Sequence, residues 1–163
     1  MDNAARKGHL EVVKWLHENR TEGCTDDAMD CAAKNGHFAT VKWLHESRTE
    51  GCTTYAMDYA ASKGHLDIVR WLHENRSEGC TFEAMGNAAT FGHFEILLFL
   101  HANRTEGCAT NAFNDGAACI KHLEIFLWLR EHYPDSVSID ELRLHGSYMP
   151  AVLDHLLGLA GHE

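Results

Sequence analysis

Basic residues are scarce in this chain of 163 residues, in which 14 Lys and Arg stand against 24 Asp and Glu. The formal net charge of -10 at pH 7 repels phosphate backbones, so we expect no nucleic-acid partner. Long apolar runs are also absent, because no stretch approaches the roughly 18 residues of a membrane span. The first residues lack the basic and then apolar layout of a signal peptide. These absences predict a soluble segment with no membrane partner.

Motifs of catalysis are missing as well. The chain has no Gly-rich phosphate loop, no GxSxG motif and no isolated Cys with a single His partner. Its reactive side chains belong instead to series of equivalent residues, which is typical of a framework rather than of a nucleophile. We therefore predict that the chain is not an enzyme, has no catalytic residues and binds no cofactor.

The chain is rich in one feature, a repeat of about 28 residues. The segment Met-Asp-x-Ala-Ala begins at Met1, Met29 and Met57, and Gly-His and Trp-Leu-His segments recur at the same period. Recurrence at a period between about 20 and 50 residues indicates a solenoid, in which each unit buries its apolar face against its neighbours. We expect a single array over residues 1–163, with repeats at about 1–24, 25–52, 53–80, 81–108 and 109–137 and a divergent C-terminal cap at 138–163.

Each repeat has the signals of a helical hairpin. Thr25 stands where an N-cap belongs, and two Asp residues follow it where carboxylates favour the helix dipole. Gly36 is a C-cap that can take a positive φ before the second helix begins. We predict helices near residues 26–35 and 38–47, with the same pattern one repeat further on. The connecting loops of about six residues lack a β-branched or aromatic run, so the fold class is all-α without a β-hairpin.

The second helix of each hairpin carries only a narrow polar stripe. In the first copy its polar residues are Glu11, Lys14 and Glu18, spaced three and four apart, and the other positions are mostly apolar. Such a helix is buried on three sides. Trp43→Ala is therefore expected to cost roughly 3 to 5 kcal/mol through the loss of a buried ring. Glu46→Ala, on the stripe, is expected to cost within about 0.5 kcal/mol.

The 13 His and 6 Cys residues raise the question of a zinc site. Zinc needs about four ligands within roughly 2.3 Å of one point. Each ligand type recurs only once per repeat here, so we predict no metal site. We interpret His9 and its copies as helix-start residues bonded to the backbone. His17 and its copies are interpreted as part of the inter-repeat core, with one ring nitrogen bonded to a loop carbonyl.

Four of the cysteines occupy one repeat position, at Cys24, Cys52, Cys80 and Cys108. Neighbouring copies in a stacked array lie roughly 10 Å apart, as packed helices do. A disulfide needs Cα atoms within about 7 Å, so we expect reduced thiols. Reduced thiols indicate the cytoplasm or the nucleus.

The segment at residues 4–16, AARKGHLEVVKWL, resembles the AAxxGHLEVVKLL heart of the ankyrin repeat, and residues 32–44 follow the same pattern. The resemblance covers residues 1 to about 132. It implies a solenoid of stacked ankyrin-like hairpins and binding of a protein partner on the concave helical face. We expect the array to be a monomer.

Two departures from the ankyrin pattern stand out. The unit is about five residues shorter than the family's unit of about 33, and the loss falls where the β-hairpin finger would be. The TPLH segment of the family, whose His ties adjacent repeats together by hydrogen bonds, is also missing. We expect Asp2, Asp30 and Asp58, which stand in that region, to accept hydrogen bonds from loop amides instead.

Positions that differ between copies are the candidates for binding, because framework roles are the same in every copy. In ankyrin repeats the two residues before Gly-His line the concave groove. The resemblance maps them onto Arg6, Lys7, Lys34, Asn35, Ser62, Lys63, Thr90 and Phe91. The variable aromatic residues Tyr55, Tyr59 and Phe82 complete the set, because exposed aromatic side chains often anchor interfaces. The alternative is that these positions are merely unconstrained and face solvent.

Three hypotheses of function remain open. The first is a non-enzymatic scaffold whose partner carries an acidic segment and an apolar anchor, matching the basic and aromatic residues of the candidate set. The second is a targeting array in a larger enzyme whose catalytic domain lies outside this chain. The third is a metal-responsive or redox-responsive ladder of Cys and His.

Overall fold

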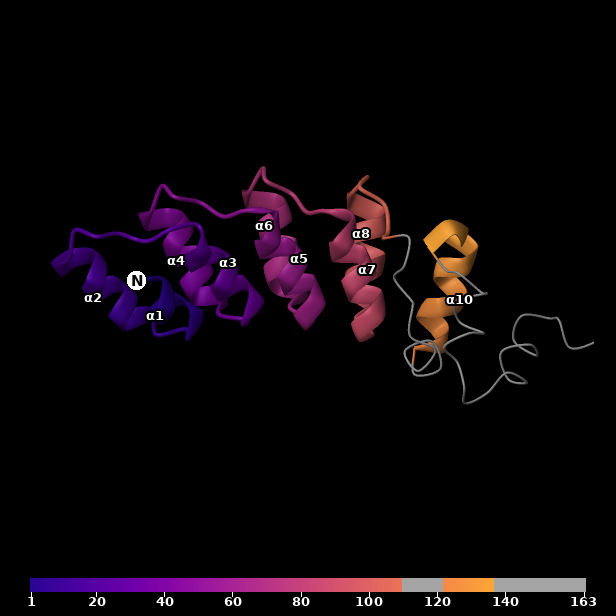
Figure 1. Cartoon of the computed structure of the whole chain (residues 1–163), viewed down its shortest axis with the longest axis horizontal. Helices are drawn as coiled ribbons and strands as arrows, with labels where there is room; N and C mark the ends of the chain where they lie inside the picture. Colours follow the sequence, from indigo (N-terminus) through magenta and orange to yellow (C-terminus); the bar gives the residue numbers. More distant parts are fainter. Residues whose placement is uncertain (110–121, 137–163) are drawn as a thin grey trace, which may run out of the picture.

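The computed structural model describes residues 1–109 and 122–136. These residues form helical hairpins that lie side by side along one long axis (Figure 1), and no strand occurs among them. The predicted all-α solenoid without a β-hairpin is confirmed for this part of the chain. The predicted cap at 138–163 and most of the first helix of the fifth repeat lie outside the described residues.

The helices follow the period of the sequence. Residues predicted at 26–35 and 38–47 form α3 and α4, and the pattern continues one repeat further on as predicted. Within the fifth repeat, the described residues form α10 and a short 3-10 helix, η1. The full set is α1 (Asp2–Arg6), α2 (Leu10–Asn19), α3 (Asp27–Lys34), α4 (Phe38–Ser47), α5 (Thr54–Lys63), α6 (Leu66–Asn75), α7 (Phe82–Phe91), α8 (Phe94–Asn103), α10 (Leu123–His132) and η1 (Pro134–Ser136).

The first helices α3, α5 and α7 begin at side-chain caps. Thr53 and Thr81 accept hydrogen bonds from backbone N–H groups at the starts of α5 and α7. The prediction that Thr25 caps α3 is wrong, because Asp26 is the N-cap there and accepts from the N–H of Asp27. Thr25 is used differently, since its N–H and hydroxyl both donate to Asp2 of the preceding repeat.

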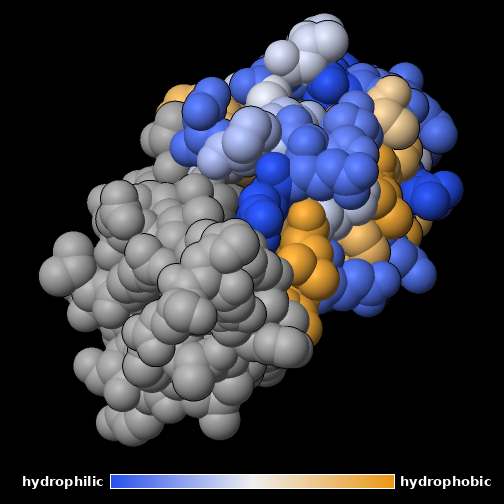
Figure 2. Space-filling model, turned by 90° about the vertical axis from the view of Figure 1, so that its right-hand side faces the viewer, coloured by the Kyte–Doolittle hydropathy of each residue, from blue (hydrophilic) through white to orange (hydrophobic). Residues whose placement is uncertain are grey.

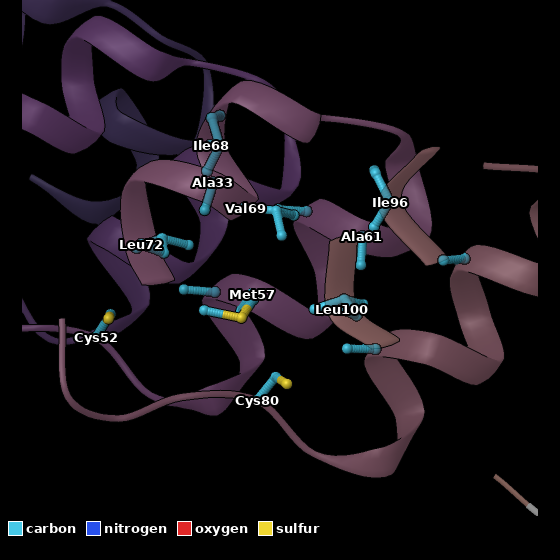
Figure 3. Close-up of a cluster of buried hydrophobic side chains, with 14 of the residues drawn as sticks. Ala33, Cys52, Met57, Ala61, Ile68, Val69, Leu72, Cys80, Ile96 and Leu100 are labelled. Carbon is cyan, nitrogen blue, oxygen red and sulfur yellow. The ribbon is translucent and has the colours of Figure 1, made fainter. Parts of the chain in front are cut away.

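The core consists of small residues on the first helices and aliphatic residues on the second helices. Ala and Met of α3, α5 and α7 are buried together with Ile, Val and Leu of α6 and α8 (Figure 3). The Ala residues let neighbouring first helices approach closely, and α1, α3, α5 and α7 contact one another in succession. The second helices contact one another much less. The first helices therefore form the closely packed layer that carries the variable residues.

The tryptophans of the second helices are less buried than the sequence predicts. Trp43 packs only partly against the core, with its ring 5.3 Å from that of His17 in an edge-to-face arrangement. Leu44 is the buried residue at this point, with 1% of its surface exposed. Trp15 is 56% exposed because α2 has no hairpin before it in the structure to cover the ring. The interpretation of Trp43 as a wholly buried ring is therefore wrong.

A glycine at the end of each first helix lies under a histidine of the next repeat. Gly64 has a φ of 82°, and a Cβ built on it would lie 2.7 Å from Cε1 of His93. The Nε2 atom of His93 donates to the carbonyl oxygen of Ser62 at 3.2 Å, and burial lowers the pKa of this imidazole. His37 makes the same contact with the carbonyl oxygen of Arg6 at 3.1 Å. The predicted backbone bond of this histidine series is confirmed at His37 and His93.

Gly64→Ala is expected to lower the free energy of unfolding by about 2 kcal/mol, because an L residue is strained at this φ and its Cβ displaces the His93 ring. Gly107 is the matched control, since its φ of 79° is similar but no described atom lies within 4 Å of a Cβ built there. Gly107→Ala is expected to cost about 1 kcal/mol, from backbone strain alone. Equal losses for the two variants in urea denaturation would contradict the packing of His93 on Gly64.

Candidate functional site

The candidate residues lie on the first helices or directly after them, and together they define the first-helix surface. The basic residues stand at the C-terminal ends of α1, α3 and α5, where cations also complement the helix dipole. Tyr55 and Phe82 stand at the opposite, N-terminal ends of α5 and α7. Phe82 and Phe91 are nine residues apart on α7, about 13 Å along the helix. The structure therefore places Phe82 away from the basic residues.

Cations and aromatic rings alternate along one line of the first-helix surface. The Nζ atom of Lys34 lies 4.3 Å from the ring centroid of Tyr59 in the next repeat. Lys63, one helical turn after Tyr59, reaches Phe91 of the following repeat, with Nζ 5.8 Å from the ring centroid. Tyr55 stacks on Tyr59 with ring centroids 5.5 Å apart. We call Lys34, Tyr59, Lys63 and Phe91 the cation–aromatic line.

The aromatic members of this surface are open to solvent. Tyr55 is 57% exposed, Tyr59 37% and Phe91 51%. Contact with a cation and with a stacked ring holds Tyr59 in place without covering it. Exposed rings that are already immobilised lose little entropy when a partner binds, which is the property of an interface anchor.

The basic residues of the first-helix surface form no ion pair with any residue that the structure describes. Among the described residues, no carboxylate lies within 4.0 Å of the charged atoms of Arg6, Lys7, Lys34 or Lys63. Acidic residues outnumber basic ones by 24 to 14 in the sequence, yet these cations have no carboxylate partner among the residues that the structure describes. Cys31, Asp27 and Asp2 still act on the charge of Arg6. No described carboxylate neutralises any of the four cations by direct contact, so they can attract an external anion.

Two polar members of the candidate set, Asn35 and Thr90, form hydrogen bonds with backbone carbonyls of the preceding helical turn. The side-chain amide of Asn35 donates to the carbonyl oxygen of Cys31 at 2.7 Å. The hydroxyl of Thr90 donates to the carbonyl oxygen of Gly86 at 2.9 Å. These bonds occupy polar atoms that would otherwise face a partner.

Framework charges form a separate set at the opposite ends of the hairpins. The guanidinium of Arg48 bonds to Glu50 and lies 3.1 Å from Nδ1 of His17 in the preceding repeat. Hydrogen bonding to Arg48 lowers the pKa of Glu50 to about 2. The pairs Arg76–Glu78 and Arg104–Glu106 repeat the ion pair, and Arg76 also lies 3.3 Å from Nδ1 of His45. The contact with the histidine is not repeated at Arg104, because Nδ1 of His73 is buried without a hydrogen-bond partner among the described residues. The interpretation that His17 bonds to a loop carbonyl is wrong, because Nδ1 of its ring contacts the guanidinium of Arg48 in the next repeat.

Buried aspartates tie the repeats together, as the sequence predicts. Asp30 accepts from the N–H of Thr53 at 2.9 Å and from its hydroxyl at 2.6 Å. Asp58 accepts from the N–H of Thr81 at 2.8 Å and from its hydroxyl at 2.9 Å. Burial raises the pKa of both carboxyls. The expected bonds from loop amides are confirmed at Asp30, Asp58 and, through Thr25, at Asp2.

The junction after the fourth repeat uses different residues. Gly86 stands where the other repeats have Asp, and Ala109 stands where they have Thr, so both partners of the hydrogen-bonded pair are replaced together. Tyr133 stands where the other repeats have Arg, and its hydroxyl lies 2.8 Å from Nδ1 of His101. The joint replacement fits the cost of leaving a buried Asp or Thr without its partner.

Cys52, Cys80 and Cys108 are poor candidates for reactive or metal-binding thiols. Cys24, Cys31, Cys52, Cys80 and Cys108 are free thiols. Burial raises the pKa of Cys52, Cys80 and Cys108 to about 11, which keeps them protonated at neutral pH. In the part of the chain that the structure describes, no three His, Cys, Asp or Glu residues come together in a group that could hold a metal ion.

The second helices carry exposed residues outside the candidate set. Lys42 lies over the ring of Phe38 and Arg70 over that of Phe99, at 4.1 and 5.2 Å from the centroids. Viewed from the C-terminal end of the array, Figure 2 shows hydrophobic residues in patches between hydrophilic ones. Leu98 and Leu127 are exposed apolar residues of α8 and α10. Leu127 is not among the predicted site residues. It occupies the repeat position of Leu98, because the fifth repeat has one extra residue before it, so that His122 follows His93 by 29 residues rather than 28.

Stacked helical hairpins with a constant core and a variable surface define an α-helical repeat protein. A family model described as ankyrin repeats (many copies) matches residues 1–45 and 50–101, more than half of the chain. The chain therefore belongs to the ankyrin repeat family, as its sequence predicts. Ankyrin repeats are generally protein–protein interaction modules and are typically non-catalytic. A search of curated proteins found no significant match. None of the described helices has the length and apolar character needed to cross a membrane.

Proposed function

We propose that this chain is a non-enzymatic scaffold that binds a partner protein on the first-helix surface. The observation that carries the proposal is a row of cations beside exposed aromatic rings, on a protein whose net charge is -10. These cations have no carboxylate partner in the described part of the chain. Constant residues carry the packing and the inter-repeat hydrogen bonds, whereas variable residues meet solvent at this surface. A partner with an acidic segment and an apolar anchor complements it.

The proposal is tested by selecting binders from a random peptide-display library on the full chain. The recovered peptides are then measured against two variants. One carries Ala at Arg6, Lys34, Tyr55 and Phe82 on the first helices, and the other carries Ala at Lys42, Arg70 and Leu98 on the second helices. Support requires that most peptides lose binding to the first variant and keep it with the second. The opposite result would place the interface on the second helices.

Charge reversal on the first-helix surface should change the association rate more than charge reversal on the second helices. Lys34→Glu with Lys63→Glu is expected to slow association of the selected peptides about tenfold and to reduce its salt dependence, because steering by the cations is lost. Phe82→Ala is expected mainly to speed dissociation. The matched control is Lys42→Glu with Arg70→Glu, which changes the net charge equally on the second helices. Surface plasmon resonance at two salt concentrations gives both rates, and equal slowing by both charge reversals would contradict a local effect.

A further inference from the structure

A pocket lies between the starts of the second helices α6 and α8. It has a volume of about 310 Å³, and Leu66, Phe94 and Ile96 line it together with the two glycines that end α5 and α7. Ile96 is 2% exposed and belongs to the core, whereas Leu66 and Phe94 are only partly buried. We call this cavity the α6–α8 pocket. Its volume is at the lower end of the roughly 300 to 1,000 Å³ of small-ligand sites, so it suits a single ring.

Aromatic rings contact each other between second helices at the two neighbouring junctions. The ring centroids of Phe38 and Trp71 are 6.2 Å apart across α4 and α6, and an equivalent Phe–Trp pair is 6.2 Å apart across α8 and α10. Between α6 and α8, the residues at these two repeat positions are Leu66 and Phe99, and both are smaller. This junction therefore lacks one ring that its neighbours have, and an aromatic side chain from outside fits the space that remains.

The α6–α8 pocket adjoins the first-helix surface. Lys63 and Phe91 directly precede the glycines at positions 64 and 92 that line the pocket. Lys63 has no carboxylate partner among the described residues, and its Nζ lies 5.8 Å from the ring centroid of Phe91. A partner whose acidic side chain meets Lys63 can therefore reach the pocket with a side chain a few residues away.

The polar residues that line the pocket favour an uncharged group inside it. Burial lowers the pKa of His93, so its imidazole is mainly neutral at pH 7. Glu95 is exposed, and its carboxylate repels a carboxylate of a ligand. The acidic residues of the partner therefore belong beside Lys63 rather than in the pocket.

We propose that the α6–α8 pocket receives an uncharged aromatic side chain of the partner protein whose acidic segment meets Lys63. This inference rests on the proposed function and adds to it the place and the chemical nature of the apolar anchor. It assigns the anchor to a pocket at one end of α7 rather than to the exposed ring of Phe82 at the other end.

The probes are end-capped synthetic peptides of three Glu, one Gly and one terminal Phe, made in both chain directions. A matched peptide carries Ala in place of Phe. NMR titration of the isotope-labelled full chain measures each affinity and locates the bound peptide. In its better direction, the Phe peptide is expected to bind at least about tenfold more tightly than the Ala peptide, because the pocket removes its ring from water. The amide signals of Gly64 and Gly92 are expected to shift the most.

Variants assign the effect to the pocket. Leu66→Phe introduces the residue that α4 and α8 have at this position, and it is expected to weaken the Phe peptide about tenfold and to leave the Ala peptide unchanged. Leu66→Phe with Phe99→Trp restores the ring pair of the neighbouring junctions and is used if urea denaturation shows that the single variant is unstable. Leu10→Phe is the matched control at the same position of the first repeat, and it should leave both peptides unchanged. Lys63→Gln is expected to weaken both peptides alike, because it acts on their acidic part.

Equal binding of the Phe and Ala peptides, or no binding of the Phe peptide, would overturn the inference. Undiminished binding of the Phe peptide to the folded pocket-filling variants would do the same, as would an equal loss with Leu10→Phe. The proposed function fails by a different result, in which display-selected binders keep their affinity for the variant with Ala at four positions of the first helices.

Discussion

Leu44→Ala is expected to lower the free energy of unfolding by about 3 to 4 kcal/mol, because it removes a wholly buried side chain and leaves a cavity. Leu44 is 1% exposed and belongs to the core that adjoining repeats share. Trp43→Ala is expected to cost less, about 2 kcal/mol, because its ring packs only partly against that core. Urea denaturation of both variants measures the two losses of stability. Their midpoints can be compared directly if the two m-values are similar.

Glu46→Ala is the control for this pair, since Glu46 lies exposed on the same helix. It is expected to change the free energy of unfolding by less than about 0.5 kcal/mol. A larger loss for Trp43→Ala than for Leu44→Ala would mean that the tryptophan ring, rather than the leucine, holds the seam between repeats.

Helix bounds could be predicted closely because local signals repeat in register. The Gly-His pair marks the end of one helix and the start of the next in each of the first four copies. The structure places α4 and α6 at equivalent positions of the second and third repeats. A helix boundary misplaced in one copy would conflict with the boundaries in the other copies. Local consistency across copies is therefore what made the fold predictable from the sequence.

Partners of long side chains could not be predicted in the same way. Periodicity identifies the face of a helix on which His17 lies, but not which atom of the next repeat reaches it. The approach of Arg48 depends on how far the following loop extends over the preceding one. The burial of Trp43 depends on the same overlap between repeats. Such contacts depend on how far one hairpin is offset from the next. The sequence pattern of a single repeat does not contain that offset.

The candidate surface was predictable as a set of positions but not as an arrangement. Variation between copies picked out Lys34, Tyr59, Lys63 and Phe91 individually. Their alternation along one line arises because each lysine reaches an aromatic ring of the next repeat. Phe82 belongs to the same variable set, yet it lies at the other end of α7. Which variable residues act together depends on both the helix turn and the stacking of repeats.

The side chain of Asp58 joins the third repeat to the fourth. The carboxylate accepts two hydrogen bonds from Thr81, and Thr81 in turn caps α7 by accepting from the N–H of Glu83. One side chain therefore fixes both the position of the next hairpin and the start of its first helix. Asp58 is 3% exposed, so water cannot replace it easily.

Asp58→Ala is expected to lower the free energy of unfolding by about 3 kcal/mol, because it leaves the N–H and hydroxyl of Thr81 without their acceptor. Asp58→Asn is expected to cost less than about 1 kcal/mol at neutral pH, since the amide oxygen still accepts from the N–H and no charge is buried. Asp67→Asn, the same change on the exposed side of α6, is the control and should cost within about 0.5 kcal/mol. Urea denaturation at constant salt measures all three.

The pH dependence of Asp58→Asn gives the sharper test. Burial raises the pKa of the Asp58 carboxyl, and the hydrogen bonds from Thr81 only partly oppose that rise. The folded chain therefore binds the proton of Asp58 more tightly than the unfolded chain does. The stabilisation of the folded state by this protonated carboxyl is full below the unfolded pKa of about 3.9 and declines as pH rises through the folded pKa. The native chain should lose stability relative to Asp58→Asn as pH rises from about 3.5 to 7. A difference that moves the other way would mean that the hydrogen bonds outweigh burial and that folding lowers the pKa of Asp58.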